Sequence, residues 1–167
     1  MNLSQLKEIW RAVGGACATQ GLKYTSEFIF RAVDKTDPSV VYYSDSDLTA
    51  KVLQTKAVQD ILNKWIREYK TSNKKSFSDT ITFTSSNSSN DLYLSIHKAS
   101  IGGNISSNGY LNFTIYDNYN FEHWDYSKAE TLKQLGVTAI NNFADWSEAR
   151  SALRPFGIFI NCDYYVG

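Results

Sequence analysis

The sequence predicts an α+β fold: an N-terminal helical half (1–70) packs on a mainly antiparallel β-sheet supplied by 71–167. The main observation is a change of hydrophobic period near Thr71. Before this point apolar residues recur every three or four positions, and after it they recur every second position. A further helical segment at about 127–153 precedes the last expected strand. Helices first, strands in the middle, then a helix and a strand are typical of the α+β class.

The first expected helix has a single apolar stripe, with Asn2 or Ser4 available as its N-cap. The stripe consists of Leu3, Leu6, Ile9, Trp10, Val13 and Cys17. Gly14 and Gly15 weaken this helix near its centre. A second periodic stretch, over 22–33, ends before Pro38, because proline cannot continue a helix.

Two more helices are expected before Thr71. Residues 45–54 form a short one behind a Ser/Asp cap. The clearest helix covers about 56–69, where the apolar side chains lie on one face and the charged ones on the other. Its apolar stripe consists of Val58, Ile61, Leu62, Trp65, Ile66 and Tyr69.

Alternating apolar and polar residues predict the strands. They are expected at 81–84, 91–97, 98–105, 110–116 and 157–166. The Asn108-Gly109 pair predicts a tight hairpin between the strands on either side of it. Paired positions in that hairpin should sum to a value close to 217, which places His97 near Tyr119–Asn120.

Length and composition restrict the class of protein. A chain of 167 residues with 43% hydrophobic residues is expected to form a single domain with a packed core. The formal net charge is zero, so no nucleic-acid partner is expected, since such binding needs a basic surface. The N-terminus lacks the basic and apolar regions of a signal peptide. No apolar run has the length of a transmembrane segment.

The two cysteines, Cys17 and Cys162, are far apart in the sequence. They could form one disulfide between the first helix and the last strand, or remain two buried thiols. The apolar surroundings of Cys17 favour buried thiols. Two cysteines are too few for a structural zinc site by themselves.

The segment 112–126 is the strongest candidate for a functional site, because a strand leads there into a loop rich in acids, histidine and aromatic residues. We expect Asp117 to act as a base or cation ligand, Tyr119 to position the substrate, and His97 or His123 to act as the general acid. The expected substrate-binding residues are Phe121, Glu122, Trp124 and Tyr126. A divalent cation such as Mg²⁺ is a possible cofactor.

Other common sites have no motif in this chain. A nucleophile elbow, a Walker loop and a dinucleotide-binding glycine pattern are all absent from the sequence. The pairs Tyr42-Tyr43 and Tyr164-Tyr165 could stack on sugars or bases, although alternation would bury half of each pair.

Three segments, 89–99, 115–121 and 140–160, resemble C-terminal effector domains of bacterial polymorphic toxins. The turn at 115–121 is also faintly similar to the active-site turn of colicin M-like bacteriocins. In that resemblance Asp117 takes the place of the first acid and Tyr119 that of the tyrosine. Asn120 replaces the second acid, and Trp124 follows His123 where arginine is expected, so the catalytic pattern is incomplete.

The resemblance implies an antibacterial effector that acts at the cell envelope and hydrolyses a phosphate linkage of a lipid-linked cell-wall precursor. Such a domain would be secreted or delivered into a target cell as part of a longer protein. Its partners would be the lipid-linked substrate at the membrane surface and a cognate immunity protein.

The alternative is a noncatalytic ligand- or glycan-binding module of a bacterial surface or phage protein. Asn120 in place of an acid, the neutral charge and the many serine, asparagine and tyrosine residues favour it, because recognition surfaces use these residues. In this case the loop aromatics make the contacts and the acids orient the loop.

Overall fold

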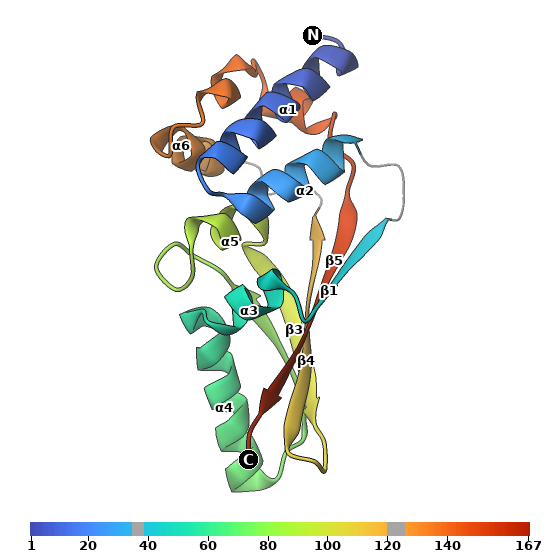
Figure 1. Ribbon diagram of the computed structural model, residues 1–167, viewed down its shortest axis with the longest axis vertical. Helices are drawn as coiled ribbons and strands as arrows, with labels where there is room; N and C mark the ends of the chain where they lie inside the picture. The colour runs from blue at the N-terminus through green and yellow to red at the C-terminus, as the bar shows by residue number, and fades with distance from the viewer. Residues whose placement is uncertain (35–38, 120–125) are drawn as a thin grey trace. The chain divides into compact units, whose positions relative to one another are not determined.

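The computed structural model describes residues 1–34, 39–119 and 126–167 (Figure 1). Its helices and strands are α1 (Leu3–Thr19), α2 (Lys23–Asp34), β1 (Val40–Ser44), α3 (Asp47–Leu53), α4 (Lys56–Ser72), β2 (Ser76–Thr82), α5 (Asn90–Ser95), β3 (Lys98–Ile105), β4 (Tyr110–Tyr119), α6 (Tyr126–Gln134), the 3-10 helix η1 (Thr138–Asn142), α7 (Trp146–Arg150) and β5 (Phe156–Tyr165). The predicted α+β class is confirmed, with helices first, a mainly antiparallel sheet, and helical segments before a final strand. In the described part of the chain, no helix is both long enough and apolar enough to cross a bilayer.

The chain forms two compact units, each assembled from three separate stretches of sequence. The helical unit contains α1, α2, α5, α6, η1 and α7, together with Tyr119 and Phe156 at the ends of two strands. The sheet unit contains β1 to β5 apart from those two residues, together with α3 and α4.

The five strands of the sheet have the order β1-β5-β4-β3-β2. β1 is parallel to β5, whereas β2, β3 and β4 are successively antiparallel. β4 and β5 run in opposite directions (Figure 1). Their side-chain contacts agree, because Thr114 bonds to Asn161 and the ring of Tyr116 contacts that of Phe159. The last strand in the sequence therefore lies inside the sheet.

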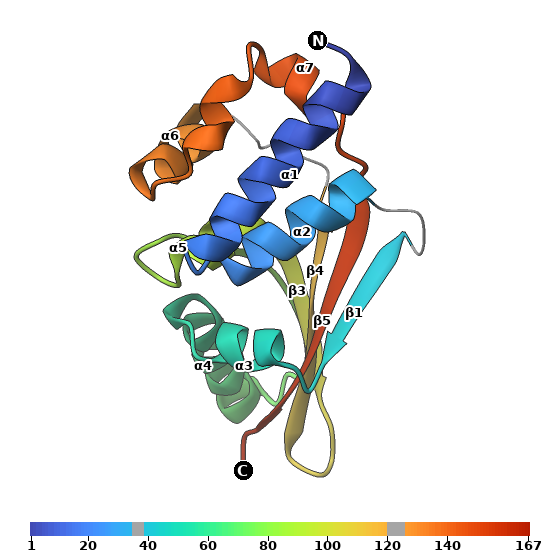
Figure 2. The ribbon, with the colours of Figure 1, turned by 45° about the horizontal axis from the view of Figure 1, so that its top comes forward.

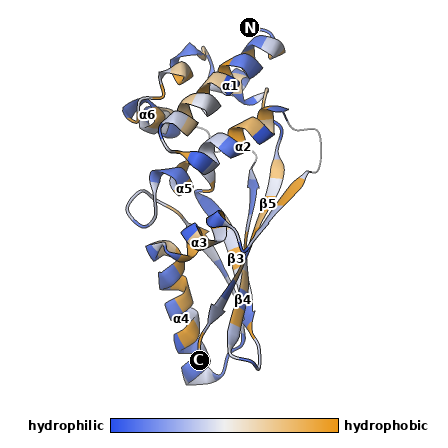
Figure 3. Ribbon diagram, viewed as in Figure 1, coloured by the Kyte–Doolittle hydropathy of each residue, from blue (hydrophilic) through white to orange (hydrophobic). Residues whose placement is uncertain are grey.

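One face of the sheet, called here the inner face, is apolar and covered by α3 and α4. The indole of Trp65 on α4 stacks on Phe77 of β2, with 5.2 Å between ring centroids. In the views of Figures 1 and 2 both helices lie on the same side of the strands. The hydropathy colours of Figure 3 show apolar and polar residues on different sides of α4, as the sequence predicts for this helix.

Asp79 links the same helix to the sheet. Its carboxylate accepts hydrogen bonds from Lys64 Nζ at 3.0 Å and Trp65 Nε1 at 3.3 Å. The hydrogen bond from Lys64 is the main reason that the pKa of the Asp79 carboxyl lies below its ordinary value.

The helical unit has an aromatic core. The rings of Phe28 on α2, Tyr119 and Phe156 lie 5.2–5.9 Å apart in pairs, and all three residues are buried. The indole of Trp10 on α1 packs on Phe143 and donates a hydrogen bond of 2.8 Å to the carbonyl of Ala149. This bond satisfies a polar group that would otherwise be costly to bury.

The N-terminus of α2 is capped by a residue distant in the sequence. The Asp91 carboxylate accepts hydrogen bonds from the backbone N–H groups of Tyr24 and Thr25, at 2.9 and 2.7 Å, and from the Thr25 hydroxyl. The amides of a helix's first turn generally lack an acceptor within the helix, and a negative charge is favourable at this end. Asp91 therefore fixes α5 to α2.

The prediction of a strand at 91–97 is wrong, because Asn90–Ser95 forms the helix α5. Leu92, Leu94 and Ser95 of this helix are all buried, so more than one side of the short helix is covered. A helix that is covered on several sides can carry apolar residues at alternate positions, and this produces the two-residue period in the sequence. His97 follows with a left-handed backbone, φ 53°, and leads into β3.

Most of the other predicted boundaries are confirmed. Asn2 and Ser46 cap α1 and α3 with reciprocal side-chain bonds. β3 has the predicted bounds, whereas β2 begins before the predicted 81–84 strand. The strand β1 was not predicted. Paired positions in the β3–β4 hairpin sum to 216, so Ser100 lies opposite Tyr116. This sum differs by one residue from the expected value.

We expect Asp91→Ala to lower the free energy of unfolding by about 2 kcal/mol, since two helix amides and a buried hydroxyl lose their acceptor. Urea denaturation followed by circular dichroism measures this change. The matched control is Asp60→Ala, which removes an exposed pair with Lys56 on α4 and should cost less than about 0.5 kcal/mol. Equal stability of the two variants would contradict the capping role.

Two glycine-to-alanine changes should have opposite effects on stability. A Cβ at Gly103 of β3 would lie 2.6 Å from the Asn112 carbonyl and 2.7 Å from Phe113 Cβ, so Gly103→Ala should cost about 3 kcal/mol. A Cβ at Gly15 meets nothing within 4 Å, so Gly15→Ala should stabilise α1 by about 1 kcal/mol. Thermal unfolding of both variants tests the prediction, and a destabilised Gly15→Ala protein would refute it.

Candidate functional site

The face of the sheet opposite the inner face, called here the outer face, carries exposed tyrosines. Tyr42 of β1 stacks on Phe159 of β5, with 5.1 Å between centroids and 14° between planes. Tyr116 of β4 contacts the same phenylalanine at 4.7 Å. Tyr42 is 67% exposed and Tyr116 40%. These three residues form a continuous band across three strands, which we call the aromatic strip.

The strip follows from the strand registers. Tyr42 pairs with Phe159 in the parallel ladder, and Tyr116 pairs with Ser100 in the antiparallel one. Ser100 in turn pairs with Thr80 of β2. One row across the sheet is thus aromatic over three strands and carries hydroxyl groups over the other two.

Amide and hydroxyl groups make up the next row of the outer face. Asn161 of β5 accepts a hydrogen bond of 2.8 Å from Thr114 and donates one of 3.3 Å to the Ser44 hydroxyl. Gly102 of β3 lies opposite Thr114 and has no side chain. Beside the strip, the surface is therefore low, polar and uncharged.

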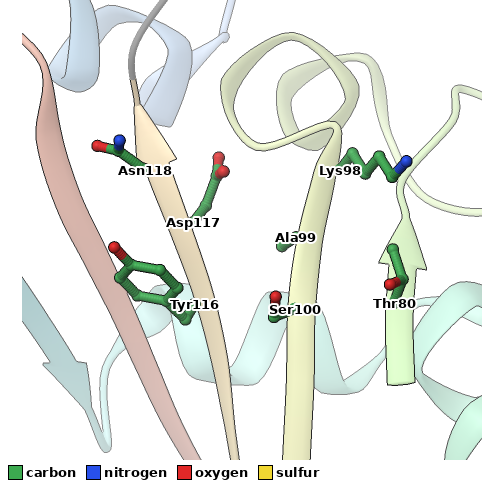
Figure 4. A pocket seen from close by; sticks show the side chains of 7 residues that line it. All are labelled: Thr80, Lys98, Ala99, Ser100, Tyr116, Asp117 and Asn118. Atoms are coloured by element: carbon green, nitrogen blue, oxygen red, sulfur yellow. The ribbon is translucent and has the colours of Figure 1, made fainter. Parts of the chain in front are cut away.

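An open hollow of about 210 Å³ adjoins the strip on the β4, β3 and β2 side. It is lined by Thr80, Lys98, Ala99, Ser100, Tyr116, Asp117 and Asn118 (Figure 4). Enclosed pockets for small molecules have volumes of about 300–1,000 Å³. This hollow is too small and too open to enclose a small molecule. It suits contact with one part of a larger ligand.

Of the predicted catalytic residues that the structure describes, Asp117 lines this hollow. It is half-buried near the end of β4, and its carboxylate lies between β4 and β3 in Figure 4, whereas Tyr116 and Asn118 lie on the other side of β4. Alternation along the strand explains this difference in direction.

Tyr119, predicted to position a substrate, is instead a buried member of the aromatic core of the helical unit. Its side chain is 5% exposed and contacts the rings of Phe28 and Phe156. The strand continues three residues beyond the predicted end at Tyr116, and this extension places Tyr119 in the core. These ring contacts are packing contacts, and the positioning role of Tyr119 stays a prediction.

His97 is not among the residues that line the hollow with Asp117. Its Nδ1 lies 3.0 Å from the carbonyl oxygen of Phe83. Because a carbonyl only accepts, Nδ1 carries the proton in this contact. The backbone N–H of Phe83 also bonds to the carbonyl of His97, so His97 extends the pairing of β2 and β3 beyond their ends. A shared cleft with Asp117 and a role as general acid stay predictions for His97.

Four of the other predicted residues, Phe121, Glu122, His123 and Trp124, lie outside the described residues. Tyr126 is the first residue of α6, and its side chain also lies outside the description. Their assignment to a site stays a prediction. Within the described residues, no group of three His, Cys, Asp or Glu side chains could hold a metal ion.

Both cysteines are free and buried, which agrees with the thiol interpretation. Burial raises the pKa of each thiol to about 12, with a further contribution from Asp91 at Cys17 and from Asp163 at Cys162. A thiol with so high a pKa is a poor nucleophile at neutral pH, so neither cysteine suits covalent catalysis.

The residues of the aromatic strip were only partly recognisable in the sequence. The sequence contains the Tyr42-Tyr43 pair, and two-residue alternation along 110–116 and 157–166 places Tyr116 and Phe159 on the face opposite the aliphatic residues of their strands. No sequence pattern indicates that β5 separates β1 from β4 and so brings the three rings together. Comparisons with protein-family models, curated proteins and solved structures give no match.

We expect both thiols to react slowly with iodoacetamide in the native protein at pH 8 and rapidly after unfolding in guanidinium chloride. Their pKa of about 12 keeps the reactive thiolate scarce, and the native rate should rise as the pH approaches that value. Mass spectrometry of peptides containing Cys17 or Cys162 reports each site. Rapid native labelling at either position would contradict the burial argument.

Proposed function

We propose that the sheet unit is a recognition module that binds a carbohydrate on its outer face, and that binding rather than catalysis is its primary activity. The observation that carries this proposal is the aromatic strip of Tyr42, Phe159 and Tyr116 on a polar surface with little charge. The proposal corresponds to the glycan-binding alternative from the sequence, with the contacts moved from the loop to the sheet.

The chemistry of the outer face suits a sugar. A pyranose ring has one face made largely of C–H groups, which pack on the negative face of an aromatic ring. Its hydroxyl groups need both donors and acceptors at the edges. Asn118, Ser100 and Thr80 in the adjoining hollow supply amide and hydroxyl groups of both kinds.

Single-stranded nucleic acid also stacks on aromatic residues, but it requires a cationic groove along its phosphates. Among the described residues that line the hollow, one is a cation, Lys98, and one is an anion, Asp117. The formal net charge of the chain is zero. The electrostatics therefore favour a neutral ligand over a polyanion.

The hydrolase hypothesis has one observation in its favour, the position of Asp117 in the hollow. Its remaining loop residues lie outside the described part of the chain, and Tyr119 has a packing role. Recognition is supported by more of the described residues, so we place it first. Envelope glycans would be available to either a delivered effector or a surface module.

We expect Tyr116→Ala and Tyr42→Ala each to weaken carbohydrate binding by about two- to tenfold, because an aromatic stacking contact contributes about 0.5–1.5 kcal/mol. Affinity gel electrophoresis in hydroxyethyl cellulose, xylan, glycol chitin and a soluble β-1,3-glucan would identify the retained polysaccharide. Titration calorimetry with that polymer then measures the loss.

The matched controls are Tyr116→Phe and Tyr42→Phe, which keep the ring and should keep most of the affinity. Urea denaturation of each variant separates lost binding from lost folding. If none of the four polymers retards the wild-type protein, the proposal fails. If Asp117→Asn stops release of phosphate-containing products from a lipid-linked precursor that the wild type cleaves, the hydrolase hypothesis takes its place.

A further inference from the structure

A second aromatic pair lies on the outer face, at the other end of β4 and β5. Tyr110 and Tyr165 contact each other with 5.1 Å between ring centroids. Tyr110 is 43% exposed and Tyr165 61%. Neither ring belongs to the strip or lines the hollow, and packing on each other leaves much of both rings in solvent.

The pair and the strip lie on the same face of the same two strands. Positions 110 and 116 on β4 differ by an even number, as do 165 and 159 on β5, so each pair of side chains points to one side of the sheet. Six residues of strand separate the pair from the strip, a distance of about 20 Å. A single sugar ring is much too short to contact both.

The surface between the two aromatic groups is polar and low. Thr114 and Asn112 of β4 lie between Tyr116 and Tyr110, and Gly102 and Asn104 lie opposite them on β3. The hydroxyl and amide groups of this floor match the alternating donors and acceptors of sugar hydroxyls. Asn161 and Asp163 of β5 lie between Phe159 and Tyr165 on this face, and the carboxylate of Asp163 disfavours an anionic ligand there.

The position of Tyr165 is set by the hairpin turn. Val166 donates a backbone hydrogen bond of 2.9 Å to the carbonyl of Gly109, and Gly109 has a φ of +82°. A Cβ at Gly109 would lie 3.1 Å from the ring of Tyr165. The turn thus holds the last strand and its tyrosine in place before any ligand binds, which reduces the entropy cost of binding.

We propose that the natural ligand is a linear, uncharged polysaccharide that lies in an extended conformation along β4 and β5 and contacts both aromatic groups at once. This inference rests on the proposed carbohydrate-binding function and specifies its substrate class. Both contacts are made by one polysaccharide molecule. Binding at one aromatic group therefore raises the effective concentration of sugar at the other. Affinity should therefore increase sharply once the oligosaccharide is long enough to span the floor.

The experiment uses the full chain and oligosaccharides of graded length prepared from the polysaccharide that the gel screen retains. Titration calorimetry should show weak binding up to a threshold length and at least about tenfold tighter binding beyond it. Tyr165→Ala should lower affinity for the long oligosaccharide about tenfold more than for the short one. Tyr116→Ala should lower both, and Tyr165→Phe should behave as the wild type.

The two proposals fail in different ways. If the wild type binds no polysaccharide, the carbohydrate function itself is refuted. If it binds but affinity does not depend on length, or if Tyr165→Ala weakens short and long ligands equally, only the spanning ligand is refuted. Unfolding curves of Tyr165→Ala and Tyr165→Phe show whether loss of the ring has disturbed the last strand. A destabilised Tyr165→Ala leaves the length dependence of the wild type as the deciding measurement.

Discussion

The sheet depends on the insertion of β5 between β1 and β4. This one placement supplies the partner of β1 and completes the aromatic strip, because Phe159 contacts Tyr42 on one side and Tyr116 on the other. The contacting residues are distant in the sequence. The free energy gained by their pairing must offset the entropy cost of closing a long loop. The pairing also requires that β5 is already available. The surface that we propose as functional is therefore among the features most dependent on complete folding.

The two faces of the sheet have different duties. On the inner face, Trp65 stacks on Phe77, and Asp79 accepts hydrogen bonds from α4. The helix therefore packs as a second layer on the sheet. The outer face is free to carry tyrosines and amides because stability comes from the other side. A surface of this kind on a rigid sheet can bind a ligand with little rearrangement.

Carboxylates in this protein show how little residue type says about role. Asp91 caps a helix across a long sequence separation, and Asp79 holds a helix on the sheet. Asp117 lines an open hollow at the end of a strand. The sequence pattern marked Asp117 through its aromatic neighbours, yet it assigned Asp91 to a strand, because the acceptor role of Asp91 depends on amides that only the fold brings to it.

The sequence by itself determined the class of fold, the amphipathic helices and the Asn108-Gly109 hairpin, since each follows from local periodicity or turn chemistry. It left two candidates, Asn2 and Ser4, for the cap of the first helix, and the structure selects Asn2. The sequence also marked Asp117 and the tyrosine pairs. Only the tertiary structure decided that α5 is a helix, that Tyr119 is core, and that β5 separates β1 from β4. The structure of each of these segments depends on the distant residues that pack against it. A two-residue hydrophobic period carries no information about those residues. The same reason explains why the aromatic strip, built from three separate strands, becomes visible only in the folded chain.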